Sequence, residues 1–269
     1  MAAVAPFRER RSGPRVYDSV RVGGLETACV SRRQLSGVMV GDCLAARGGR
    51  RAPRLVFASN GHAVAMAALD RKFRATLTKA DLIHADGEPI VAASRFFTAT
   101  PVPERSATTD FLFDAAEAAA RHGLTFFLLG STEEINTRAA VEVEAAGVTV
   151  VGRRNGYFRR QDEAAIVDAI NASGADVLWV GLGVPFEYEF CLRHKARLKV
   201  GWVVTCGGCF NFAAGDYRRA PDWMQRSGLE WLYRLWREPR RLFWRYLVTN
   251  PVAIAMLLFR TGTSKLSAS

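Results

Sequence analysis

The sequence predicts an α/β fold with a mostly parallel sheet, because short apolar runs alternate with helical stretches along most of the chain. Each run is continuously apolar rather than alternating with polar residues, which is typical of strands covered on both faces. Strands that alternate with helices favour parallel pairing. The runs lie at Leu55–Ala58, Leu82–His84, Leu124–Leu129, Val148–Val151, Val177–Val180 and Val200–Val204.

The start of the chain has a different composition, and we expect residues 1–18 to be a disordered basic N-terminus. This segment is rich in arginine, contains Pro6 and Pro14, and lacks the apolar centre of a secretion signal. The next segment, Ser19–Cys29, is expected to be β-type. A helix is expected over Ser31–Arg47.

Helical stretches separate the predicted strands, and helical patterns alone continue at the end of the chain. From Ala220 onward no strand pattern remains, so we expect an α/β core in residues 19–219 and a helical appendage in residues 220–269. Within the core, one apolar stripe has four-residue spacing and two shorter stripes follow it. The stripes are Ala65, Leu69, Phe73 and Leu77; Phe111, Ala115 and Ala118; and Ile166 and Ile170.

The run Tyr217–Arg260 is rich in arginine and tryptophan. It holds nine arginines against three acids, and four of the chain's six tryptophans. Arginine beside interfacial aromatic residues suits an anionic membrane surface, where each basic residue contributes about 1 kcal/mol. The alternative is an ordinary helical hairpin that packs its aromatic side chains into a core. The tryptophans are Trp223, Trp231, Trp236 and Trp244.

A net charge of +11 and a pI near 10 require an acidic partner, such as anionic lipid or a phosphorylated ligand. Nucleic acid is not expected, because no zinc-finger or RNP-like signature is present. The apolar run Tyr246–Phe259 has fourteen residues and is interrupted by Asn250 and Pro251. A spanning helix needs about 20 residues. We therefore expect a cytoplasmic protein bound peripherally to the inner face of a membrane.

The turns after the predicted strands are candidate binding positions, because ligands bind beyond the carboxyl ends of parallel strands. Ser59 and Asn60 follow one strand, and Gly130 and Ser131 follow another. Gly130-Ser131 with Glu134 predicts a capping box at a helix start that suits phosphate. Gly181-x-Gly183 does not complete a dinucleotide fingerprint, since Phe186 takes the third glycine position. No nicotinamide cofactor is therefore expected.

Asp86 is the carboxylate with the most distinctive position. It follows a strand and precedes Gly87, so it is expected in a turn over the sheet, where it can serve as a general base on a sugar hydroxyl. The alternative is that it caps the next helix, a role worth about 1 kcal/mol. No Asp-x-Asp pair occurs in the chain, so no metal is expected. Arg105 is then the nearby candidate for neutralising phosphate charge.

Cysteine and histidine give weaker signals. Cys206-Gly-Gly-Cys209 has the spacing of a metal or redox pair, but no second pair accompanies it, so a tight glycine turn is favoured. His84 is expected in the core of the sheet, whereas His62 lies near a strand end and is either a ligand contact or a polar helix start.

Longer motifs resemble a known family. The segments FASNGHAVAMAALDRKFRATLTKADLIHADGEPIV, PERSATTDF, FFLLGSTEE and RAPDWMQRSGLEWLYRLWREPRR closely resemble the WecG/TagA/CpsF glycosyltransferases, over about Val20–Phe259. The resemblance implies an inverting, metal-independent enzyme without a cofactor. Such an enzyme transfers a sugar from a UDP-sugar to a polyprenyl-diphosphate-linked saccharide for wall polymer, capsule or exopolysaccharide. It also implies a Rossmann-like core and a C-terminal helical appendage that covers the site and contacts the membrane.

The resemblance carries roles to individual residues. It implies Asp86 as the catalytic residue, Asn60 as a nucleotide-sugar contact and Arg105 as a substrate contact. It also implies diphosphate contacts among the appendage arginines Arg234, Arg237, Arg240 and Arg241. This chain departs from the family pattern where Ala58 replaces Thr, Glu187 replaces Gln, Thr108 replaces Gly and Asn211 replaces Asp. Ser59 and Glu187 are retained as candidate substrate contacts, and these departures bear on the identity of the donor sugar.

Two other functions are compatible with parts of the sequence. A non-catalytic basic module that docks on anionic lipid or nucleic acid would bind no UDP, so calorimetry with UDP separates it from the enzyme. A nucleotide-sugar epimerase would need NAD, which the incomplete glycine fingerprint disfavours. The resemblance also makes a homo-oligomer possible, without fixing the number of subunits.

Overall fold

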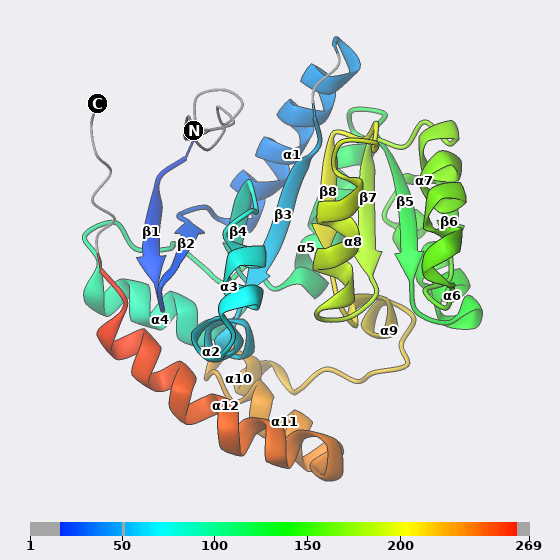
Figure 1. The fold of residues 1–269 in the computed structure, drawn as a ribbon. Coiled ribbons are helices and arrows are strands. Elements are labelled where there is room, and N and C mark those ends of the chain that lie inside the picture. Colours follow the sequence, from blue (N-terminus) through cyan, green and yellow to red (C-terminus); the bar gives the residue numbers. More distant parts are fainter. Residues whose placement is uncertain (1–16, 50–51, 263–269) are drawn as a thin grey trace, which may run out of the picture.

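The computed structural model describes residues 17–49 and 52–262 of the 269-residue chain. Most of the predicted disordered N-terminus, residues 1–16, lies outside the described residues. The described chain is an α/β fold around a parallel sheet of six strands in the order β4-β3-β8-β7-β5-β6 (Figure 1). The strands are β3 (Arg54–Ser59), β4 (Leu82–Ala85), β5 (Thr125–Gly130), β6 (Thr149–Arg154), β7 (Val177–Gly181) and β8 (Trp202–Thr205).

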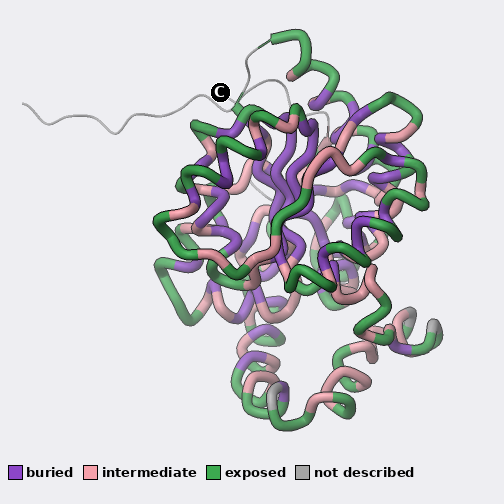
Figure 2. The backbone as a smooth tube through the Cα atoms, turned by 90° about the vertical axis from the view of Figure 1, so that its right-hand side faces the viewer, coloured by how far each residue is buried: buried purple, intermediate pink, exposed green. Residues whose placement is uncertain are grey.

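All six predicted strands are confirmed to within three residues at each end, because the sheet is buried. Four of them, β4, β5, β7 and β8, are buried along nearly their whole length, and Figure 2 shows the buried backbone concentrated in the central strands. Side chains from the two faces enter two separate apolar cores. Continuous apolar runs are therefore what this sheet requires.

Helices cover both faces of the sheet. One face packs against α1 (Arg32–Arg47), α5 (Thr108–Ala120), α6 (Glu133–Ala145) and the short α9 (Cys209–Ala213). The other packs against α2 (Gly61–Leu69), α3 (Arg71–Leu77), α7 (Glu163–Ala172) and α8 (Phe186–His194). Helix α4 (Glu88–Phe97) adds Ile90 and Val91 to this second core. The 3-10 turn η1 (Arg160–Asp162) precedes α7.

The predicted β-type entry is a hairpin of β1 (Ser19–Val22) and β2 (Leu25–Ala28). Gly23 and Gly24 join the two strands with φ values of 57° and 86°, which glycine adopts without the steric cost paid by other residues. The predicted helix over Ser31–Arg47 is also confirmed. Ser31 caps it, with its hydroxyl accepting from the Gln34 N–H.

The stripe Ala65–Leu77 is divided between two helices, so the prediction of one continuous stripe is wrong. Asp70 leaves the helical conformation and caps α3 through its carboxylate, which accepts from the N–H groups of Lys72 and Phe73 at 2.7 and 3.2 Å. Leu69, at the end of α2, is 56% exposed rather than buried. The cap therefore overrides the apolar spacing.

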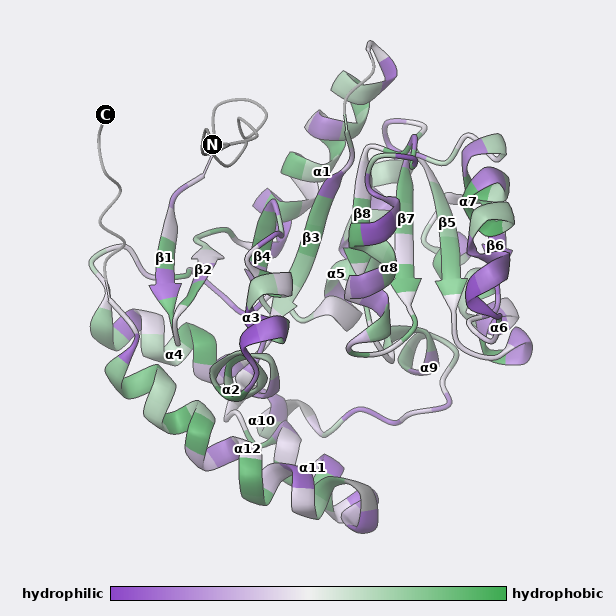
Figure 3. Cartoon of the chain, viewed as in Figure 1, coloured by the Kyte–Doolittle hydropathy of each residue, from purple (hydrophilic) through white to green (hydrophobic). Residues whose placement is uncertain are grey.

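The C-terminal appendage consists of α10 (Asp222–Arg226), α11 (Glu230–Arg237) and α12 (Pro239–Phe259). Helix α12 continues through Asn250 and Pro251, so these two residues do not end the helix. Within the described residues, Leu242–Phe259 is long and apolar enough to cross a membrane by length and composition. Figure 3 shows this helix mostly in the hydrophobic colours.

Helix α12 lies along the core rather than apart from it. Leu242, Ala253 and Leu257 are buried, and the helix packs against α2. After α12 the chain returns to the hairpin, where the Gly24 N–H donates to the Arg260 carbonyl at 2.9 Å. The opposite face of α12 stays open, as its exposed apolar side chains show. They are Phe243, Trp244, Leu247, Val248, Ile254, Leu258 and Phe259.

Candidate active site

Asn60 and Asp86 lie side by side at the carboxyl edge of the sheet, because they follow the neighbouring strands β3 and β4. The Asn60 side-chain amide donates to Asp86 Oδ2 at 3.1 Å, while its carbonyl oxygen caps α2 by accepting from the Ala63 N–H at 3.0 Å. A Cβ on Gly87 would lie 3.2 Å from Asn60, which is a tight contact. The absence of a side chain at Gly87 therefore lets the two strand ends lie close together. The predicted turn position of Asp86 is confirmed.

The second oxygen of Asp86 is held by the start of α5. Thr108 donates its N–H and its hydroxyl to Asp86 Oδ1 at 2.7 and 3.0 Å. Helix α4, which follows Asp86 in sequence, has no side-chain cap at its N-terminus. The alternative interpretation, that Asp86 caps the next helix, is therefore wrong. Asp86 accepts from a helix that starts 22 residues later.

Asp86 is ionised at neutral pH. Burial opposes its ionisation, but His84, Arg105 and the hydrogen bonds from Thr108 and Asn60 outweigh burial, so its pKa lies below its ordinary value. His84 is fully buried, as predicted, and its Nδ1 lies 2.9 Å from the Ser106 carbonyl. Burial lowers the pKa of His84. Asp86 itself keeps part of its surface exposed.

Arg105 lies beside Asp86, as predicted, and also contacts the appendage. Its Nε donates to the Asp86 carbonyl at 2.7 Å, and its Nη2 lies 2.8 Å from Glu230 Oε2 on α11. Both charged side chains are mostly buried, with 20% and 16% of their surfaces exposed. The sequence interpretation missed Glu230. The available signal was that it is one of only three acids in the basic C-terminal run.

Glu187 faces the backbone rather than open solvent. It is 3% exposed, and its Oε2 accepts from the N–H groups of Gly183 and Gly207 at 3.2 and 3.0 Å. Ser59 is also fully buried, and its hydroxyl has no partner among the described residues. These placements favour supporting roles for both side chains over direct contact with a substrate.

The capping box predicted for Gly130, Ser131 and Glu134 is wrong. Ser131 adopts a left-handed conformation with φ of 57°, its N–H donates to the Gly181 carbonyl, and Thr132 caps α6 instead. A Cβ on Gly130 would collide with the backbone of Gly181, so the β5 and β7 ends approach too closely for a side chain there. Contacts from Gly130 and Ser131 to a diphosphate remain predictions.

The predicted glycine turn between Cys206 and Cys209 is confirmed. The Cys209 N–H donates to the Cys206 carbonyl at 2.9 Å, and Gly207 has a φ of 49°. Both thiols are free and buried, and burial raises the pKa of each above its ordinary value. The reactive thiolate form is therefore disfavoured at both positions.

A groove of about 530 Å³ opens between α9 with the segment that follows it and the α11–α12 junction. Arg234 and Arg237 line it, and the Arg234 guanidinium lies 5.4 Å from the Phe212 ring centre. Arg240 is exposed outside the lining, and the Arg241 side chain lies outside the described part of the structure. The full lining is Phe212, Asp216, Tyr217, Arg218, Tyr233, Arg234, Trp236, Arg237 and Glu238.

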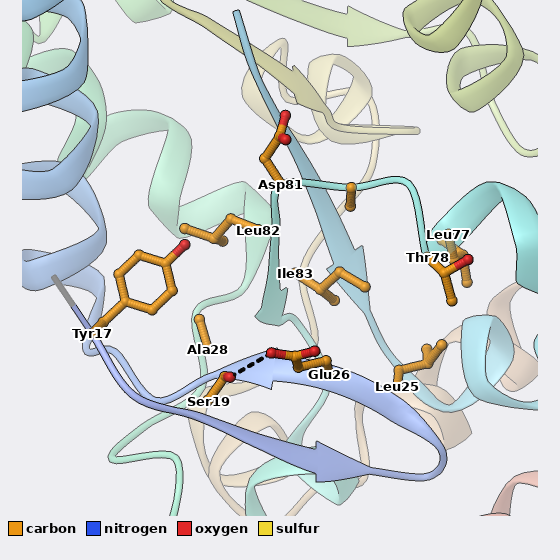
Figure 4. A pocket seen from close by; sticks show the side chains of 11 residues that line it. Tyr17, Ser19, Leu25, Glu26, Ala28, Leu77, Thr78, Asp81, Leu82 and Ile83 are labelled. Carbon is orange, nitrogen blue, oxygen red and sulfur yellow. Dashed lines mark hydrogen bonds between the residues drawn. The ribbon is translucent and has the colours of Figure 1, made fainter. Parts of the chain in front are cut away.

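A smaller cavity of about 130 Å³ lies between the β1–β2 hairpin and the amino end of β4 (Figure 4). Ser19 donates to Glu26 across it at 2.8 Å, and Tyr17, Asp81 and Leu82 line it. None of the predicted site residues lines this cavity. The carboxyl edge is therefore the candidate site. Helix α11 connects it to the groove, since Glu230 pairs with Arg105 and Arg234 lines the groove.

Comparison with known proteins identifies the family of this chain. The model of the glycosyl transferase WecG/TagA/CpsF family matches residues 20–266. A curated relative from Bacillus spizizenii (strain ATCC 23059 / NRRL B-14472 / W23) is 30% identical over 189 residues, which cover 70% of this chain and 72% of the relative. That relative is named N-acetylglucosaminyldiphosphoundecaprenol N-acetyl-beta-D-mannosaminyltransferase. The chain belongs to the WecG/TagA/CpsF family of glycosyl transferases.

Proposed function

We propose that this chain is an inverting, metal-independent glycosyltransferase that moves a sugar from a UDP-sugar to a saccharide linked to polyprenyl diphosphate. The observation that carries the proposal is the position of the Asp86 carboxylate at the carboxyl edge of the sheet, where Asn60 and Thr108 hold it beside Arg105, which pairs with Glu230 of the appendage. The Bacillus relative acts, by its name, on an acceptor with a sugar on undecaprenyl diphosphate. N-acetylmannosamine is accordingly the first donor sugar to test.

Asp86 accepts a proton from an acceptor hydroxyl in this mechanism. Its Oδ1 already accepts two hydrogen bonds from Thr108, whereas its Oδ2 accepts one, from Asn60. Each carboxylate oxygen has about two lone-pair positions, so Oδ2 retains one for the acceptor hydroxyl. As the proton moves to Oδ2, the hydroxyl oxygen forms a bond to the anomeric carbon. The bond from that carbon to UDP breaks on the opposite face, and UDP leaves with the electron pair.

Arginines neutralise the phosphate charge. Arg105 lies beside the Asp86 turn, and Arg218, Arg234 and Arg237 line the groove under the appendage. Preorganised cations in a site of this kind stabilise a departing diphosphate without needing to reorient. We assign the lipid-linked diphosphate of the acceptor to the groove, because its aromatic side chains suit the adjoining prenyl chain.

The same proposal places the protein at the cytoplasmic face of a membrane, attached peripherally. The exposed face of α12 carries Phe243, Trp244 and Leu247, and Trp223 and Trp236 on the neighbouring helices are 61% and 75% exposed. These exposed tryptophans do not pack into a core. The alternative of an ordinary helical hairpin would require them to do so. Aromatic side chains beside arginines suit the boundary between lipid headgroups and acyl chains.

The test is a transfer assay with the full chain, a prenyl-diphosphate-linked N-acetylglucosamine and a panel of UDP-sugars that includes UDP-N-acetylmannosamine. The acceptor is supplied in anionic or neutral vesicles, with and without a metal chelator. We expect a disaccharide product with inverted anomeric configuration, insensitive to the chelator and faster on anionic vesicles. No product with any donor, together with no UDP binding by calorimetry, would instead support the non-catalytic lipid-binding module.

A further inference from the structure

Glu187 connects the carboxyl ends of two central strands. It is the second residue of α8, and its single oxygen Oε2 accepts from Gly183, in the turn after β7, and from Gly207, in the turn after β8. These glycines have φ values of 79° and 49°, and a Cβ on either would meet no atom within 4 Å. The left-handed turns, rather than crowding, therefore require glycine here.

The β8 turn leads from Glu187 to the candidate base. Cys209 closes this turn, and its Sγ lies 3.6 Å from the carbonyl oxygen of Thr108. Thr108 in turn donates two hydrogen bonds to Asp86. A continuous series of contacts thus runs from Glu187 through the Cys206–Cys209 turn and Thr108 to Asp86.

We propose that Glu187 is a positioning residue, which holds the glycine turns after β7 and β8 in the arrangement that Asp86 requires and loosens them when it takes up a proton. The inference rests on the proposed transfer reaction. Glu187 does not need to touch a substrate for this role, and its 3% exposure agrees with that. The family pattern has Gln at this position, and the proposed role states what the replacement by Glu changes, namely that the side chain can take up a proton.

Protonation weakens this contact because hydrogen bonds to an ionised acceptor are roughly twice as strong as those to a neutral one. Burial raises the pKa of Glu187 to about 7, although the two N–H donors lower it. The titratable groups on which its charge acts are Tyr188 and Cys191 from α8 and Cys206 after β8. Burial raises the pKa of all three, so they are neutral at pH 7. The contact is therefore strongest above pH 7 and weakens below it.

Asp86 and Glu187 are thus expected to act in different pH ranges. The pKa of Asp86 lies below its ordinary value, so loss of the base begins only at strongly acidic pH. A fall in turnover centred near pH 7 belongs to Glu187 instead. Burial also lowers the pKa of His62, near Asn60, to about 4, which removes that side chain from the neutral range.

The kinetic experiment compares Glu187→Ala, Glu187→Gln and Glu189→Gln with the unmodified chain. Misplacing a catalytic group by about 1 Å can cost about a hundredfold in rate. We expect Glu187→Ala to lower kcat by about 10- to 100-fold with a smaller change in KM. Glu187→Gln keeps an oxygen acceptor but is neutral like protonated Glu187, so its kcat should equal the low-pH value of the unmodified chain at every pH and show no fall centred near pH 7. The control Glu189, on the same helix and 38% exposed, should behave as the unmodified chain.

A second measurement does not depend on transfer activity. In the chain labelled with ¹⁵N-glycine, the amide signals of Gly183 and Gly207 should shift together with one midpoint near pH 7, and should not do so in Glu187→Gln. Independent or absent shifts in the unmodified chain would overturn the shared contact. A Glu187→Ala chain with full kcat, or a fall near pH 7 that persists in Glu187→Gln, would overturn the positioning role. Absence of transfer with a normal amide titration would refute the proposed function alone.

Discussion

The carboxylates at the two edges of the central sheet have different kinds of hydrogen-bond partner. At the amino edge each acid is paired with a basic side chain and also accepts a hydrogen bond from a strand. Asp176 accepts from both Nε and Nη2 of Arg47 at 2.7 Å and from the Thr125 N–H at 2.8 Å. The other pairs are Asp81 with Lys195 at 2.7 Å, beside the Leu55 N–H, and Asp42 with Arg54 at 2.6 Å, beside the Trp202 indole.

At the carboxyl edge the carboxylates of Asp86 and Glu187 are held mainly by neutral donors. Their hydrogen-bond partners are backbone N–H groups, the Thr108 hydroxyl and the Asn60 amide. Arg105 contacts the carbonyl oxygen of Asp86, and its ion pair is with Glu230 of the appendage. A carboxylate paired with a fixed cation is stabilised in its ionised form. Because its hydrogen-bond partners are neutral donors, Asp86 Oδ2 keeps a lone-pair position for a hydroxyl group.

Removing the amino-edge acid should affect stability and leave the chemistry intact. Asp176→Ala leaves the partners Arg47 and Thr125 unsatisfied, so we expect the free energy of unfolding to fall by about 2–3 kcal/mol. Urea denaturation measures this change, and kcat at 25 °C should stay within about twofold. Asp168→Ala is the control. Asp168 is 71% exposed and pairs with Arg197, so this change should cost less than about 1 kcal/mol. A folded Asp176→Ala chain without transfer activity would show that the amino edge has a catalytic role.

Changing a neutral donor at the carboxyl edge should move a pKa and lower stability at pH 7 by about 1.5 kcal/mol, less than the loss of Asp176. Thr108→Val removes the hydroxyl that donates to Asp86 at 3.0 Å and keeps the N–H bond. A hydrogen bond to a charged group contributes about 1.5 kcal/mol, so the pKa of Asp86 should rise by about 1 unit. The carboxyl ¹³C shift of Asp86, followed against pH, measures it. Thr76→Val, on the exposed side of α3, is the control, and an unchanged pKa in Thr108→Val would contradict the neutral-donor interpretation.

Local patterns predicted much of this fold for a physical reason. The six strands are nearly continuous apolar runs because helices cover both faces of the sheet. The turn position of Asp86 was predicted because Asp86 follows a strand and precedes Gly87. The errors occurred where a single side chain or backbone angle overrides a pattern. Asp70 interrupts a regular apolar stripe by capping α3, and the left-handed Ser131 moves the cap of α6 to Thr132.

The remaining features depend on contacts between distant parts of the chain. Arg105 and Glu230 are 125 residues apart, and Thr108 reaches Asp86 across 22 residues. Nothing local in either segment specifies its partner. Glu187 illustrates a further limit, since the family resemblance suggested a substrate contact, whereas its burial and two backbone donors indicate support of the turns.

The central claim is that Asp86 takes the proton of the acceptor hydroxyl. Its most direct test is the transfer rate of Asp86→Asn with the lipid-linked acceptor at saturating donor, alongside circular dichroism to confirm the fold. Asparagine keeps the shape and still accepts from Thr108, but it cannot take up the proton. A general base contributes about 10²- to 10⁴-fold, so kcat should fall by that factor. A folded Asp86→Asn chain with near-normal kcat would contradict the assignment.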